Sequence, residues 1–192
     1  MRSIVFHAFW LLSLFEPALA EQATHCASDE VTYFNCSIAG GRQVASLCGS
    51  GYNVEAKQSG YLQYRFGVPA SPEFLFPAST AQDASLDRYT YSATRSRNYD
   101  RYWLELQFED SGFVYSLRSV EKRRENIVDY SASIVVRQLL APCGDACPKL
   151  QTPPNKIVKT YICSNPEAGA KLYLGGVVRL MTTPGRSNSN RF

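Results

Sequence analysis

Histidine is scarce in this chain, which has two in 192 residues. His7 lies in an apolar N-terminal run, so His25 is the one imidazole that remains beyond it. Ser-His-Asp and Cys-His sites need a histidine as the base. His25 would have to serve from a chain end, which is normally mobile. The sequence therefore argues against a nucleophilic hydrolase.

The motifs of common cofactor sites are also missing. Neither a Gly-rich phosphate loop nor a G-x-S-x-G elbow occurs. Zinc sites usually draw on several histidine and cysteine ligands, and the cysteines here are expected to pair with one another. The net charge of +3 is too small to indicate nucleic acid. We therefore expect no cofactor, no metal and no nucleic-acid partner.

Apolar runs long enough to suggest a targeting segment are confined to residues 1–20. Arg2 precedes the apolar run Ile4 to Phe15, and Ala18-Leu19-Ala20 has the small residues of a cleavage site. The run is too short to remain in a bilayer as a helix. We expect a signal peptide, and hence an exported protein, periplasmic or secreted, with no integral membrane segment in the mature chain. One domain is expected over 21–181, followed by a flexible tail at 182–192.

All six cysteines follow the expected signal peptide. An even number in an oxidising compartment predicts three disulfides among fifteen possible connectivities. A reversal at Gly40-Gly41 predicts a hairpin that would bring Cys36 opposite Cys48. For the C-x-x-x-C from Cys143 to Cys147, a redox or metal pair is the alternative to a structural disulfide. The predicted pairs are Cys36 with Cys48, Cys143 with Cys147 and, by elimination, Cys26 with Cys163.

Alternating apolar and polar residues dominate the middle of the chain. The alternation runs from Arg101 to Glu109 and resumes from Phe113 to Leu117 after the turn Asp110-Ser111-Gly112, which predicts a β-hairpin. Glu121 to Asn126 is expected to be a polar connection or a frayed helical turn. Further strands are predicted at Ile134–Leu140, Ile157–Cys163 and Val177–Met181, with an edge or loop at Phe74–Pro77 and a short helix at Pro166–Leu174. The fold expected is mostly β: an antiparallel β-sandwich or barrel stapled by disulfides, with at most one short helix near the C-terminus.

Residues 61–66 alternate in the same way, and two rows of side chains result. Leu62, Tyr64 and Phe66 are predicted to face the core. The opposite row, Tyr61, Gln63 and Arg65, is expected to be a solvated face, because antiparallel sheets commonly expose one side to water. Its ring and guanidinium make a binding surface the alternative.

The hairpin cysteines and the following G-Y-L-Q-Y-R-F-G at residues 60–67 resemble a group of uncharacterised exported bacterial proteins with an L-Q-Y-R-F-G signature. The resemblance covers about residues 31–67 and, more loosely, Gly112 to Tyr115. It implies an exported β-rich protein and assigns no catalytic residue.

A pair of carboxylates is the one enzymatic option that the sequence leaves. Glu105 and Glu109 share a strand face but lie about 13 Å apart at the usual rise per residue. Glycosidase pairs are roughly 5–9.5 Å apart. Glu105 could pair with a carboxylate on another strand, but a wet face on which Glu and Arg oppose each other across strands is the simpler interpretation.

The segment Arg88 to Trp103 combines positive charge with aromatic rings, the residue types that dominate binding hot spots. In the alternative interpretation its tyrosines, Tyr89, Tyr91 and Tyr102, pack against the sheet and the arginines extend over them. The loop positions Arg95, Arg97 and Tyr99 are expected to be exposed and dispensable for folding. The candidate binding residues are Arg88, Tyr89, Tyr91, Arg95, Arg97, Tyr99, Arg101 and Trp103, with Tyr61 and Arg65 as a second surface.

Three functions remain compatible with these observations. The first is a non-catalytic binding or inhibitor module of the bacterial envelope that recognises an unknown protein or glycan, by analogy at the level of the fold. The second is a secreted structural or effector-like protein that acts outside the cell. The third is a carboxylate-based carbohydrate-active enzyme. Two close carboxylates in a pocket would favour the third function, and a surface of aromatic rings and arginines would favour the first two.

Overall fold

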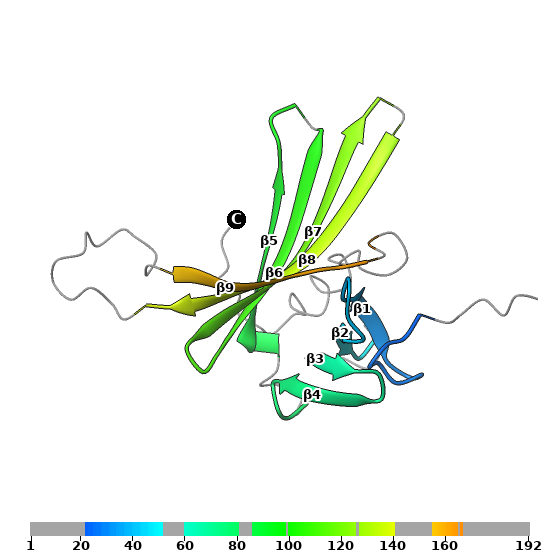
Figure 1. Cartoon of the computed structure of the whole chain (residues 1–192), viewed down its shortest axis with the longest axis vertical. Coiled ribbons are helices and arrows are strands. Elements are labelled where there is room, and N and C mark those ends of the chain that lie inside the picture. Colours follow the sequence, from blue (N-terminus) through cyan, green and yellow to red (C-terminus); the bar gives the residue numbers. More distant parts are fainter. Residues whose placement is uncertain are drawn as a thin grey trace, which may run out of the picture.

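The computed structural model describes residues 22–51, 60–80, 86–98, 100–125, 127–140, 155–164 and 166. In these ranges the chain forms nine antiparallel strands in two sheets, preceded at β5 by a 3-10 turn, η1 (Leu86–Arg88) (Figure 1). The first sheet contains β1 (Val31–Ser37), β2 (Val44–Gly49), β3 (Leu62–Val68) and β4 (Ser71–Phe76), paired in that order. The second contains β5 (Tyr89–Arg95), β6 (Arg101–Asp110), β7 (Phe113–Arg124), β8 (Ile127–Leu139) and β9 (Asn155–Ile162), also paired in order. The predicted antiparallel β-sandwich with disulfides is confirmed.

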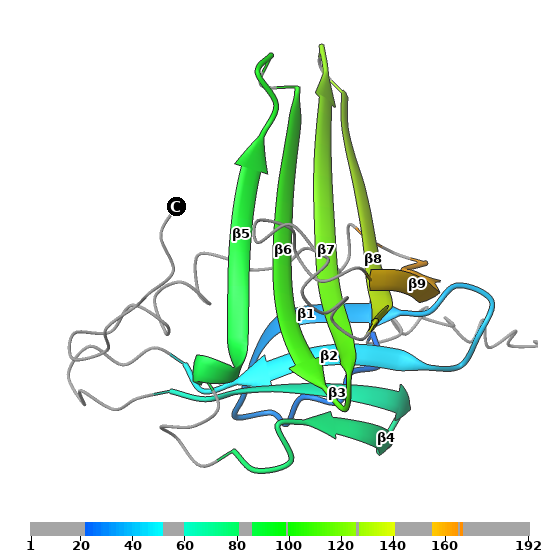
Figure 2. The same ribbon diagram turned by 90° about the vertical axis from the view of Figure 1, so that its left-hand side faces the viewer.

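The two sheets cross at a steep angle. Figure 2 shows β1 to β4 running across the lower ends of β5 to β8, as in the orthogonal class of sheet packing. The core lies where the sheets cross, and the other ends of β5 to β8 project beyond the first sheet (Figure 2). The long strands therefore serve two purposes, since one end closes the core and the other end is free of it.

Phe108 of β6 lies at the centre of this core. Its ring centroid is 4.2 Å from that of Phe76 and 5.2 Å from that of Tyr64, both in the first sheet. On its own sheet the ring stacks on Tyr115 at 4.8 Å. Stacked and edge-on ring pairs contribute beyond the area they bury. These aromatic contacts thus join the two sheets.

The β6–β7 hairpin follows the predicted alternation, with Ser111 and Gly112 at positive φ in the turn. The expected polar connection at Glu121–Asn126 is wrong for most of its length, because β7 continues to Arg124 and β8 begins at Ile127. The charged residues of this stretch alternate across a sheet that has left the core, so their polarity does not break the strand. The predicted edge at Phe74–Pro77 is confirmed, since β4 is an edge strand.

Both disulfides among the described residues differ from the predicted pairs: Cys26 bonds to Cys48, and Cys36 bonds to Cys163. In the β1–β2 register Cys36 faces Ala45, three residues before Cys48. An odd offset places two side chains on opposite faces of a sheet. Cys36 therefore points into the core, where it meets Cys163 just beyond β9.

Several predictions fall on parts of the chain outside the described residues. They are the signal peptide at 1–20, the pair Cys143 and Cys147, the helix Pro166–Leu174 apart from its first residue, the strand Val177–Met181 and the tail 182–192. In the part that is described, no helix has the length and apolar character needed to cross a membrane.

Tyr89 supplies a testable detail of the core. Its buried hydroxyl donates to the carbonyl oxygen of Phe76 at 2.6 Å and accepts from the N–H of Tyr64 at 3.1 Å. Tyr89→Phe leaves two buried backbone groups without that partner, so the free energy of unfolding should fall by about 1–3 kcal/mol. Guanidinium titration measures this, and Tyr91→Phe, at a half-buried ring, should change stability by less than about 0.5 kcal/mol. Equal losses in the two variants would contradict the assignment.

Candidate partner-binding site

The projecting end of the second sheet is made by two hairpins, β5–β6 and β7–β8 (Figure 2), and both carry basic residues. We call it the arginine end, and its basic residues are Arg95, Arg97, Arg101, Lys122, Arg123 and Arg124. Its four acidic residues are Asp100, Glu121, Glu125 and Asp129. Positive charge is therefore in excess at an end of the sheet that projects beyond the first sheet.

Strand register explains why these residues meet. Across the sheet, Arg95 faces Tyr102, which faces Glu121, which in turn faces Tyr130. On the next row Arg101 faces Lys122. A hydrogen bond of 2.7 Å from the Arg123 N–H to the Asp100 carbonyl oxygen ties the two hairpins together. The arginine end is thus held by backbone pairing, independently of its side chains.

Two arginines of this end lie on aromatic rings. The guanidinium of Arg95 is 5.3 Å from the ring centroid of Tyr102, and that of Arg101 is 5.4 Å from the ring centroid of Trp103. Consecutive strand residues point to opposite faces, so Tyr102 and Trp103 hold one arginine on each face of β6. Stacking restrains a planar guanidinium while its edge can still donate hydrogen bonds.

One face of the arginine end encloses a cavity of ≈ 300 Å³. Its lining consists of Arg95, Arg101, Tyr102, Leu104, Ser119, Glu121, Arg123 and Tyr130. The lining thus includes three arginines but a single acidic residue, Glu121, whose carboxylate is already paired with Arg123. Such a lining suits an acidic group, because arginine donates in a planar fork that matches carboxylates and phosphates.

In the loop between β5 and β6, the pKa of Asp100 is affected by a hydrogen bond and by the neighbouring positive charge. The hydroxyl of Ser96 donates to Asp100, and this hydrogen bond, together with the nearby Arg101 and Arg124, lowers the pKa of the Asp100 carboxyl. At the start of β8, Ile127 and Val128 pair with Arg124 and Arg123 and are 64% and 40% exposed. Apolar side chains next to arginines are usual at binding surfaces.

Comparisons with known proteins do not extend this description, because the chain matches no protein-family model, no curated protein and no solved structure. What the chain does must then be inferred from its own geometry and charge.

The structure separates the residues of the predicted Arg88–Trp103 surface. Arg95 and Arg97 are exposed, as predicted, and Arg101 and Trp103 lie half-buried at the arginine end. Tyr99 lies outside the described residues. Including Tyr89 among the binding residues was wrong, because it is 1% exposed and belongs to the core.

Two other residues of that segment lie away from the arginine end. Arg88 is placed at the opposite end of β5, where its guanidinium is 5.2 Å from the ring centroid of Phe76. Tyr91 packs against the core. Tyr102 packs against the core as well, although it also lines the cavity of the arginine end. The alternative interpretation, in which these tyrosines pack against the sheet, is therefore correct for Tyr89, Tyr91 and Tyr102.

The second predicted surface, Tyr61 and Arg65, is covered rather than solvated. Residues 22–30, the N-terminal segment, lie along this face: Asn35 donates to the Ala23 carbonyl oxygen at 3.0 Å, and the His25 N–H donates to Ser46. Gln63, in the same row, is 6% exposed. The expectation of a wet face is wrong because nothing in the alternating pattern reveals which segment packs on its polar side.

Glu30 anchors this segment through its carboxylate. Arg65 donates to both of its oxygens, at 2.6 and 2.7 Å, and the hydroxyl of Tyr61 donates at 2.6 Å. Burial alone would raise the pKa of Glu30, but these hydrogen bonds, with one from the Ala27 N–H, outweigh burial and lower it. Burial and the bond to Glu30 raise the pKa of Tyr61 to about 12.

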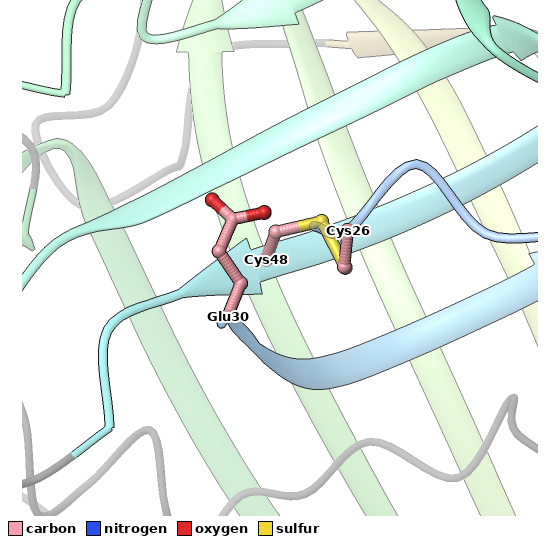
Figure 3. Close-up of side chains that lie close together, drawn as sticks. All are labelled: Cys26, Glu30 and Cys48. Carbon is pink, nitrogen blue, oxygen red and sulfur yellow. A yellow bond between two sulfur atoms is a disulfide. The ribbon is translucent and has the colours of Figure 1, made fainter. Parts of the chain in front are cut away.

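Cys26, Glu30 and Cys48 cluster closely enough to be considered as metal ligands (Figure 3). Metal binding needs thiolates, whereas these two sulfurs are bonded to each other. The carboxylate of Glu30 is already engaged by Arg65. The cluster therefore serves to fasten the N-terminal segment to the first sheet.

Glu105 and Glu109 are not brought to one site either. Glu105 accepts from Arg118 at 2.9 Å, its cross-strand neighbour, and from Gln107 at 2.8 Å. Glu105 and Glu109 line different cavities, and Glu109 shares its own with Asp87 and Arg88. The simpler interpretation, Glu and Arg opposed across strands, holds for Glu105.

Sequence reasoning missed Lys122, Arg123, Arg124 and Tyr130, which complete the arginine end. The K-R-R run was assigned to a connection, and no strand was predicted over residues 127–133. The signal that could have found them is the alternation of Val120, Lys122 and Arg124 with Glu121 and Arg123, which continues the preceding strand without interruption.

Proposed function

We propose that this protein is an exported, non-catalytic binding module of the bacterial envelope that recognises an acidic protein or glycan through the arginine end. The observation that carries the proposal is the gathering of basic and aromatic residues from two hairpins at the end of the second sheet that projects beyond the first sheet. Stability alone does not require such a projection. Rigid strands that present arginines and rings are a usual basis for recognition.

Export is part of the proposal. Its supports are the signal-peptide pattern at residues 1–20 and the two disulfides, which persist in oxidising compartments. The resemblance of the L-Q-Y-R-F-G signature to exported bacterial proteins points the same way. Against the enzymatic alternative, Glu105 is paired with Arg118 rather than with a second carboxylate.

Removing charge from the arginine end should weaken binding without affecting the fold. Arg97 and Arg124 are both exposed, so Arg97→Ala with Arg124→Ala should change stability by less than about 0.5 kcal/mol for each substitution. The affinity for a partner captured from an envelope extract should fall roughly 30-fold to 1,000-fold, because two charge-assisted contacts are lost and each contributes about 1–2 kcal/mol. Surface plasmon resonance and thermal melting measure the two effects.

The matched control removes the same charge elsewhere. Arg42 and Lys156 are also exposed, but Arg42 lies between β1 and β2, and Lys156 pairs with Gln138 at the other end of β8. Arg42→Ala with Lys156→Ala should therefore leave the affinity unchanged. Binding should also weaken as ionic strength rises, since the Debye length falls to about 3 Å at 1 M salt. If both double variants bind equally well, the arginine end is not the recognition surface and the proposal fails.

A further inference from the structure

A second cavity, of ≈ 370 Å³, opens between the two sheets at the ends of β7 and β8 opposite to the arginine end. Ligand pockets are commonly about 300–1,000 Å³ and mostly apolar. Six side chains from both sheets form its apolar lining: Tyr64, Phe66, Phe74, Tyr115, Val136 and Tyr161. The cavity is therefore large enough for a single small ligand and has a lining suited to a flat apolar group.

The rings of this lining are arranged as two pairs, each of which joins the sheets. Phe74 of β4 stacks on Tyr115 of β7 at 5.2 Å, and Phe66 of β3 lies 5.1 Å from Tyr161 of β9. All four rings are only partly buried although they pack against the core. Part of their surface thus remains accessible, and an aromatic ligand would gain both buried area and ring contacts there.

Two side chains of opposite charge complete the cavity, Glu73 of β4 and Lys159 of β9. The ammonium of Lys159 lies 5.5 Å from the ring centroid of Tyr161, which keeps it at the aromatic lining. Among the residues that the structure describes, neither Glu73 nor Lys159 takes part in an ion pair. A ligand could therefore pair with both charges without displacing an existing partner.

We propose that this cavity binds a free aromatic α-amino acid. The ring would lie among the aromatic side chains, the carboxylate would pair with Lys159, and the ammonium would pair with Glu73. A zwitterion with an aromatic side chain is the simplest molecule that matches all three features at once. This site is separate from the arginine end, and its occupation does not depend on the proposed recognition function.

The first experiment is isothermal titration of the mature protein with L-tryptophan and three analogues. L-tryptophan should bind with a dissociation constant of roughly 0.1–1 mM, as expected for a ligand of this size. N-acetyltryptophan lacks the ammonium, tryptophanamide lacks the carboxylate and indole lacks both, so each should bind at least about fivefold more weakly. No saturable binding of L-tryptophan, or equal binding of indole, would overturn the proposal.

Variants then locate the site. Lys159→Gln should weaken L-tryptophan binding about fivefold or more and remove the preference over tryptophanamide. The control is Lys156→Gln, an exposed lysine of the same strand outside the cavity, which should bind as the original protein does. Val136→Phe should fill the cavity and abolish binding, with circular dichroism checking the fold. Equal effects of the two lysine substitutions would overturn the assignment to this cavity.

Discussion

Replacing Cys36 and Cys163 together with alanine is expected to lower the free energy of unfolding by about 5 kcal/mol. This disulfide closes a loop with a sequence separation of 127 residues, and in the chain-entropy model a longer loop restricts the unfolded chain more. It also joins the first sheet to the residue that follows β9, so its loss removes the one disulfide between the sheets among the described residues.

The shorter bridge provides the comparison. Cys26 and Cys48 are separated by 22 residues, and the same model gives about 3 kcal/mol for replacing both with alanine. Guanidinium unfolding of the two double variants, followed by tryptophan fluorescence, measures the difference. A larger loss from Cys26→Ala with Cys48→Ala would show that strain or unfolded-state structure, rather than loop length, decides the stabilisation.

The sandwich itself was accessible from sequence because its strands obey a period of two. From Arg101 to Phe108 every second side chain is apolar, and the structure buries Leu104, Leu106 and Phe108 together. The turn at Ser111-Gly112 needed positive φ, and its residues supply it. Patterns of this kind are local, so they can be read without knowing how the sheets pack.

Disulfide pairing was not accessible, because it depends on register and on which face each cysteine occupies. Both Cys36 and Cys48 lie in the predicted hairpin, but they are three positions out of register and point to opposite sides of the sheet. A slip of one or two residues cannot be detected from a run as short as β2. Because the third pair was predicted by elimination, the wrong pairing of Cys36 with Cys48 also made the prediction for Cys26 and Cys163 wrong.

The candidate site was predicted in part. The segment that contains Arg95, Arg97 and Arg101 was recognised by composition, but composition cannot tell which end of a strand a residue occupies. Tyr89 begins β5 in the core and Arg95 ends it in the arginine end. The basic residues contributed by β7 are some twenty positions further along the chain, and only the sheet order β5-β6-β7-β8 brings them alongside.

Arg65→Met is expected to be the most destabilising single substitution on the covered face of the first sheet, by about 3–5 kcal/mol at neutral pH. The side chains of Arg65 and Glu30 are 15% and 6% exposed, so the substitution leaves a carboxylate buried without its partner. Glu30→Gln combined with Arg65→Met removes both charges and should cost less than Arg65→Met alone.

The dependence of this loss on pH tests its cause. In the folded protein the pKa of Glu30 is lowered, so its ion pair contributes stability that is present above the unfolded pKa, near 4.5, and is lost as the pH falls through the folded value. In Arg65→Met the carboxyl is buried without its ion-pair partner and protonates at a higher pH than in the original protein. The difference in stability between the two proteins should therefore shrink as the pH falls from neutral towards the lowered pKa of Glu30. The double variant has no carboxyl at residue 30, so its difference from the original protein should change only as the pH falls from about 4.5 towards the lowered pKa of Glu30, where the original protein loses its ion pair. Urea unfolding at neutral and acidic pH distinguishes these outcomes, and a loss that is the same at both would mean that Arg65 acts by packing its aliphatic stem rather than through its charge.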